Sequence, residues 1–232
     1  ITDSQGTVLN TPIPTLGGQA SIVGPYTGDP NVTIRSGQWI YNGNTRSIEL
    51  YDVTANATTW PTINSGAGSE VTMMKALAER YPNGIVFYKF TLSGMALTES
   101  AASGSAIEQA ANDQWPLLES GWRDCAMVAI PRDLGRVADA IGVGLILGDN
   151  DCFNAGPAAF PTSAPNFITD LRSLFTTRSN GDELPIVWMQ PQKHLDDGGQ
   201  STHGTQANRN SVMASVASLT TINRVRVILA DP

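Results

Sequence analysis

Basic residues, histidine and cysteine are all scarce in this chain of 232 residues. Lysine and arginine together occur 14 times against 21 aspartate and glutamate residues, so the formal net charge is −7. The lysines are Lys75, Lys89 and Lys193, and no basic run occurs. Proteins that bind nucleic acid or anionic membranes need clustered lysine and arginine. We therefore expect no nucleic-acid partner and no membrane partner.

Long apolar runs are also missing. No stretch approaches the roughly 20 apolar residues that a membrane-spanning helix needs, and the longest run, 141–147, suits a buried strand. The chain starts at Ile1 without a visible signal peptide, as expected of a processed chain or of a part of a longer protein. Cys125 and Cys152 are too few for a disulfide framework or a zinc site. We predict two buried thiols, with a disulfide between them as the alternative.

Amphipathic helical patterns alternate with apolar strand-like runs along most of the chain. Continuous apolar strands between amphipathic helices are typical of a parallel sheet covered on both faces. The sequence therefore predicts an α/β fold, a three-layer α/β/α sandwich of flavodoxin-like type with a central parallel sheet. The expected strands are 85–92, 141–147, 185–190 and 225–230, and the expected helices are 69–81, 134–140, one carrying 167–175 and one carrying 212–219.

The stretch at about 11–63 has a different composition from the rest. It is rich in glycine, proline, asparagine and threonine, with short strand-like pieces at 32–34 and 38–41. We interpret it as an irregular or hairpin-bearing insertion, because it has no apolar pattern long enough for a core of its own. The prediction is one domain over 1–232.

Chemistry-bearing residues follow the predicted strands. In an open parallel sheet, ligands bind beyond the carboxyl ends of the strands. Gly94 follows the strand 85–92, Asn150 follows 141–147, and Ser4 lies in an Asp-Ser-Gln-Gly string near the start of the chain. A serine can act as a nucleophile, while a backbone amide and an asparagine side chain can hold an oxyanion. The alternative is that Ser4, Gly94 and Asn150 only shape turns.

The order of these motifs resembles the SGNH hydrolase superfamily, and within it the sialate O-acetylesterase and acetylxylan esterase-like branch. The segment 148–151, Gly-Asp-Asn-Asp, matches the superfamily block Gly-x-Asn-Asp. The segment 89–97 resembles the Lys-Tyr-Ala-x-Gly-Gly-Thr-x-Leu block of that branch, and Asp3-Ser4 resembles its first block. The similarity spans about 64–230 and supports the predicted fold.

The resemblance implies roles for particular residues. It assigns Ser4 as the nucleophile, and the Gly94 amide and the Asn150 side chain as the oxyanion hole. The catalytic base should be a histidine, and the family block Asp-x-x-His places Gln200 where the aspartate would stand before His203. In the family this block follows the last strand, whereas His203 precedes the 225–230 strand. Three alternatives stay open: His203 as the base from another loop, a histidine beyond Pro232, or loss of activity.

Other polar clusters have less specific interpretations. His194 with Asp196 and Asp197 could hold a metal, although acidic pairs in glycine-rich loops are usually solvated. Asp149 and Asp151 flank Asn150, where they either orient site groups or cap a turn. Trp115 and Trp122 suit either a sugar-binding cleft or the core.

The leading expectation is a serine esterase that removes O-acetyl groups from carbohydrate and needs no cofactor and no metal. Its partner would be an acetylated carbohydrate substrate or a glycan ligand, and an oligomer stays open. The alternative is an inactive SGNH-like domain that serves as a carbohydrate-binding or structural module of a surface or virion assembly resembling a phage tail. Both readings favour an extracellular, cell-surface or virion-associated location.

Overall fold

The computed structural model divides into two compact units by the contacts within the chain. One unit comprises Ile1–Ser93 and Trp122–Arg136, and the other comprises Gly94–Gly121 and Val137–Pro232. The single-domain organisation expected from the sequence stays a prediction. The structure describes residues 38–43, 45–50, 77, 80–81, 84–90, 94–102, 104–175, 183–190 and 204–228.

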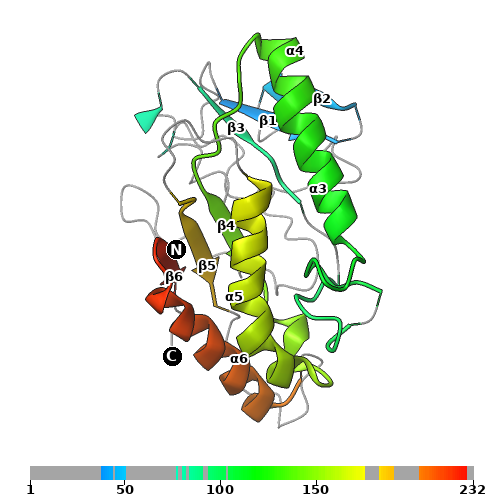
Figure 1. Cartoon of the computed structure of the whole chain (residues 1–232), viewed down its shortest axis with the longest axis vertical. Helices are drawn as coiled ribbons and strands as arrows, with labels where there is room; N and C mark the ends of the chain where they lie inside the picture. The colour runs from blue at the N-terminus through cyan, green and yellow to red at the C-terminus, as the bar shows by residue number, and fades with distance from the viewer. Residues whose placement is uncertain are drawn as a thin grey trace, which may run out of the picture. The chain divides into compact units, whose positions relative to one another are not determined.

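The first unit contains a small mixed sheet. Strands β1 (Gln38–Asn42) and β2 (Ser47–Leu50) form an antiparallel hairpin, and β3 (Ile85–Phe87) pairs with β1 in parallel, in the order β2-β1-β3 (Figure 1). The hairpin lies within the stretch expected to bear one. The strand expected at 85–92 is thus shorter than predicted, and it pairs with this hairpin among the described residues.

A long helical segment covers residues 115–134. It begins as α3 (Trp115–Asp124), continues as a π-helix (Cys125–Ala129) and ends as α4 (Ile130–Leu134). Gly135 ends it in a left-handed conformation at φ 63°, and its N–H donates to the Pro131 carbonyl. Such a glycine cap terminates a helix. The helix predicted at 134–140 is therefore wrong, because the chain has already left helical geometry at Gly135.

Two aspartates join this segment to the hairpin within the first unit. The Asp124 carboxylate accepts hydrogen bonds from the Tyr41 hydroxyl and the Arg46 guanidinium. The Asp133 carboxylate accepts from the Ile48 N–H at 2.8 Å and from Arg132. Short strands of four and five residues are weak alone, so these bonds help to fix the hairpin.

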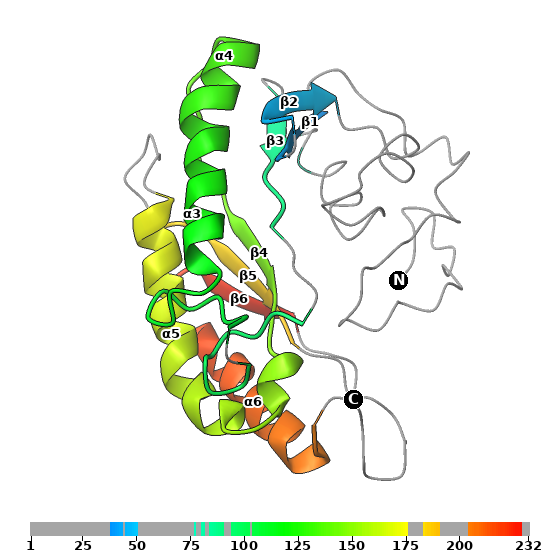
Figure 2. The same ribbon diagram turned by 90° about the vertical axis from the view of Figure 1, so that its right-hand side faces the viewer.

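The second unit contains a parallel sheet in the order β4-β5-β6, formed by Val143–Ile146, Ile186–Met189 and Val225–Ile228. Helix α5 (Gly156–Leu174) connects β4 to β5, and α6 (Gln206–Ser218) precedes β6. Short 3-10 turns lie at Asn150–Cys152 and Leu219–Thr221. Right-handed crossovers between neighbouring parallel strands place successive helices on the same face. Figure 2 shows α5 and α6 together on one face of this sheet.

Aromatic side chains fill the layer between this sheet and α5. Trp188 of β5 is completely buried and contacts Phe160 and Phe167 edge-on, with ring centroids 5.9 and 6.4 Å apart. Trp115 packs on Phe167 in the same way and is 4% exposed. Trp115 is therefore a core residue rather than a sugar-binding face. The predicted α/β class, with a parallel sheet flanked by helices, is confirmed.

Both cysteines match the prediction of buried thiols, since Cys125 and Cys152 are buried and free. Among the residues that the structure describes, none of the helices has the length and apolar character that crossing a membrane requires.

Candidate functional site

The candidate site lies in the turn that follows β4. Gly148 begins this turn at φ 126°, a conformation that essentially only glycine adopts, and it is buried. The preceding residue, Leu147, accepts a hydrogen bond from the Trp188 indole at 3.0 Å, which fixes the end of the strand. The Asn150–Cys152 turn therefore leaves the sheet at its carboxyl edge, where open parallel sheets bind ligands.

The Asn150 side chain reaches the segment that contains Gly94. Its amide nitrogen donates to the Met95 carbonyl at 3.0 Å. Gly94 precedes Met95, is exposed and has a φ of 75°. The structure thus brings together two of the residues singled out from the sequence, although 56 positions separate them along the chain.

Asp151 ties the same two segments together from the buried side. Its carboxylate is fully buried and accepts hydrogen bonds from the backbone N–H groups of Leu97, at 2.8 Å, and Thr98, at 2.9 Å. Burial raises the pKa of this carboxyl, while the two N–H donors oppose the shift. These bonds link the Asn150 turn to the segment that contains Leu97 and Thr98.

The beginning of α6 packs against the other side of the turn. Thr205 caps the helix, with its hydroxyl oxygen accepting from the Asn208 N–H at 3.2 Å. The Asn208 side chain donates to the Cys152 carbonyl at 2.9 Å. Gly204 lies so close to Cys152 that a Cβ on it would stand 2.4 Å from the Cys152 carbonyl oxygen.

A buried ion pair completes this contact. Arg209 of α6 is 1% exposed, and its Nη1 lies 3.5 Å from the Asp149 carboxylate. The sequence reasoning missed Arg209. Its signal was present in the helical pattern, because Arg209, Val212 and Val216 fall on one buried face of α6.

Ser4 and His203 lie outside the described residues, as do His194, Asp196 and Asp197. The roles assigned to Ser4, Gly94, Asn150 and His203 therefore stay predictions. In the described part of the chain, no three histidine, cysteine, aspartate or glutamate residues gather in a way that suits a metal ion.

Cys152 is not a suitable nucleophile, although it lies next to Asp151. Burial raises the pKa of its thiol to about 12, and its sulfur contacts the Gly148 carbonyl at 3.3 Å. The thiolate is the reactive form of cysteine. At neutral pH this thiol is protonated, and a protonated thiol is a poor nucleophile. Ser4 therefore stays the predicted nucleophile.

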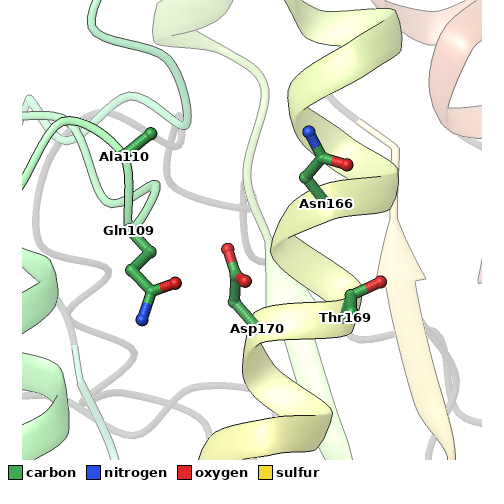
Figure 3. A pocket seen from close by; sticks show the side chains of 5 residues that line it. All are labelled: Gln109, Ala110, Asn166, Thr169 and Asp170. Atoms are coloured by element: carbon green, nitrogen blue, oxygen red, sulfur yellow. The ribbon is translucent and has the colours of Figure 1, made fainter.

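A polar pocket of about 400 Å³ lies beside α5 in the same unit. Figure 3 shows the Asp170 carboxylate and the Gln109 carboxamide turned toward the same space between helix and loop. Burial raises the pKa of Asp170. The helical wall of the pocket begins at Asn166, ten residues into α5, or about 15 Å along the helix axis from its start. Its lining residues are Gln109, Ala110, Asn166, Thr169 and Asp170.

Comparison with known proteins gives one informative result. No family model matches the chain, and no curated protein matches it. The fold is similar to that of a plant protein. The crystal structure of a protein from Arabidopsis thaliana superposes with a TM-score of 0.60 at 15% sequence identity, over 87% of this chain and 71% of the plant protein. At that identity, the similarity to the Arabidopsis protein shows a shared α/β fold and nothing about activity.

Proposed function

We propose that this protein is a serine esterase that removes O-acetyl groups from carbohydrate. The observation that carries the proposal is the hydrogen bond from Asn150 to Met95, which brings the two predicted oxyanion-hole segments together at the carboxyl edge of the sheet. The substrate class rests on the motif resemblance to the sialate O-acetylesterase branch. The fold shared with the Arabidopsis protein supports an SGNH-like scaffold for this chemistry.

The proposed reaction begins with the Ser4 hydroxyl. Its oxygen bonds to the acetyl carbonyl carbon while a base takes its proton, and the carbonyl oxygen becomes an oxyanion. The bond to the sugar oxygen then breaks, and that oxygen receives the proton. Water repeats the sequence on the acetyl-serine and releases acetate.

The oxyanion would be held by the Gly94 N–H and the Asn150 amide. An amide nitrogen carries two hydrogens, and one of them serves the Met95 carbonyl. The second is geometrically independent of that bond and would donate to the oxyanion. Loss of one such donor costs on the order of 10²–10³ in rate.

His203 is the proposed base. It directly precedes Gly204, which lies against Cys152, two residues after Asn150. That chain connection supports a base supplied from the segment before α6. A histidine beyond Pro232 is the other candidate for this role.

The test is turnover of p-nitrophenyl acetate and of an acetylated xylan by the wild-type chain, Ser4→Ala and Asn150→Ala. We expect Ser4→Ala to abolish turnover and Asn150→Ala to lower kcat by about 10²–10³-fold. In the same chain, turnover that His203→Ala abolishes identifies His203 as the base, and turnover that survives in His203→Ala excludes it.

A folded wild-type protein with no more turnover than Ser4→Ala would contradict the proposal. It would leave the non-catalytic alternative, a carbohydrate-binding or structural module. Binding of the acetylated and the deacetylated xylan, measured by calorimetry, would then distinguish a glycan-binding module from a purely structural one.

A further inference from the structure

Arg209 is a charged side chain in an unusual position. It is 1% exposed and is among the largest fully buried side chains in the described residues. Removing a cation from water is unfavourable, and a nearby anion offsets that cost only where the geometry is good. Asp149, whose carboxylate lies 3.5 Å away and whose side chain is 12% exposed, supplies the opposite charge.

The position of this ion pair in the fold suggests what it does. Asp149 is the residue directly before Asn150, and Arg209 lies in the first turn of α6. The pair therefore joins α6 to the backbone that carries the Asn150 side chain. Packed apolar residues of similar volume often stabilise a core as well as a buried ion pair does, so stability alone gives no reason for a charge at this position.

Two further contacts act at the same junction. Asn208 donates to the Cys152 carbonyl at 2.9 Å, and Gly204 packs against the same carbonyl. The turn is thus held from the α6 side, while Asp151 holds it from the side of Leu97 and Thr98. The turn that carries Asn150 is thus bonded to two other segments of the chain, one on each side.

We propose that Arg209 is a positioning residue, which acts through Asp149 to hold the Asn150 amide in place for the oxyanion. This inference rests on the proposed esterase function for its catalytic consequence. Its structural consequence, an immobilised Asn150 amide, does not depend on that function. The two can therefore be tested separately.

Arg172 provides a matched control. It is also largely buried, with 17% of its side chain exposed, and its Nη1 lies 3.4 Å from the Glu183 carboxylate. It also donates to the carbonyls of Leu184 and Asn223. Those residues precede β5 and β6, so Arg172 lies at the amino edge of the sheet, opposite the Asn150 turn.

The experiment compares Arg209→Met, Arg209→Lys and Arg172→Met in two measurements. The first is hydrogen exchange of the Asn150 side-chain amide by NMR, with its resonances assigned by their disappearance in Asn150→Ala. We expect exchange to accelerate at least tenfold in Arg209→Met. In Arg172→Met we expect little change, even where the two variants lose the same amount of unfolding free energy. Arg209→Lys keeps the charge and should recover part of the protection.

The second measurement is kcat and KM with p-nitrophenyl acetate. We expect Arg209→Met to lower kcat by about 10- to 100-fold, as a misplaced catalytic group does, while KM stays near the wild-type value. Arg172→Met should leave kcat unchanged. If Arg209→Met does not fold, the double variant Asp149→Asn/Arg209→Met removes both charges, and it should recover the unfolding midpoint without recovering kcat.

Unchanged exchange of the Asn150 amide in every folded Arg209 variant would overturn the positioning role, whether or not the protein is active. Recovery of kcat together with stability in the double variant would overturn it too, because that result describes a merely structural ion pair. Wild-type protein without turnover would instead count against the esterase function, and the exchange measurement would still decide the role of Arg209.

Discussion

Two glycines give the Asn150 turn its geometry. Gly148, after the end of β4, has a φ of 126°, and Gly204, which lies against Cys152, has a φ of 86°. The first allows the chain to turn sharply, and the second allows the start of α6 to touch the turn. Both features depend on the missing Cβ.

Gly204→Ala should therefore destabilise the protein strongly. The new Cβ would stand 2.4 Å from the Cys152 carbonyl oxygen, and the left-handed backbone adds strain. Overpacking costs about 1–3 kcal/mol and the backbone conformation about 1–2 kcal/mol. The difference in unfolding free energy between the wild type and Gly204→Ala, measured in urea, gives the sum of these two costs. Gly104→Ala is the control, since φ is 78° there but nothing lies within 4 Å of the added Cβ. Equal losses in the two variants would contradict the close contact.

Single residues also show where sequence reasoning reaches its limit. Gly94 and Asn150 could be singled out because they occur in a recognisable order of motifs. The helical pattern places Arg209 on the same face as Val212 and Val216, but it does not identify the partner that lets an arginine be buried there. That partner, Asp149, lies 60 positions earlier in the chain.

Among the elements, the β1–β2 hairpin depends on charged side chains from the helical segment of its own unit. Asp133 accepts hydrogen bonds from Arg132 and from the Ile48 N–H of β2. Arg132 first, and then the Ile48 N–H, lower the pKa of Asp133 from 3.8 to about 2. Arg46 lowers the pKa of Asp124 in the same way.

The stability contributed by Asp133 should depend on pH in a defined direction. Because its pKa is lower in the folded than in the unfolded chain, the contribution is complete above about pH 4 and is lost as the pH falls toward about 2. We expect Asp133→Asn to unfold at lower urea than the wild type at pH 6, with the difference shrinking between pH 4 and pH 2. A difference that stays constant over this range would show that the charge of Asp133 has no part in it.

The elements differ in how well the sequence predicts them. The apolar patterns in the sequence predict β4, β5, β6, α5 and α6 where the structure has them. The same burial against the sheet that stabilises these elements also requires their apolar residues. The segment 115–134 is not among the helices expected from the sequence, although the structure forms α3, the π-helix and α4 there. It contains Pro116 in the first turn of α3, where a proline is tolerated, and Pro131 near its end, directly after the π-helical part.

For the whole chain, the alternation of apolar runs with amphipathic helical patterns predicts a parallel sheet. A parallel sheet in turn predicts a site beyond the carboxyl ends of its strands. The order β4-β5-β6 with α5 and α6 on one face follows from right-handed connections between neighbouring strands. The pairing of β3 with the β1–β2 hairpin does not follow, because strand pairing within a mixed sheet depends on contacts between distant segments. The fold shared with the Arabidopsis protein agrees with the predicted class.

The most direct test of the central claim is covalent capture of the nucleophile. The wild-type chain would be treated with a fluorophosphonate, which phosphonylates an activated serine with release of fluoride, and then digested and sequenced by tandem mass spectrometry. The account predicts one adduct, on Ser4, which forms much more slowly in Asn150→Ala. An unmodified Ser4 in the folded protein, or an adduct that forms equally fast in Asn150→Ala, would contradict a serine esterase built around the Asn150 turn.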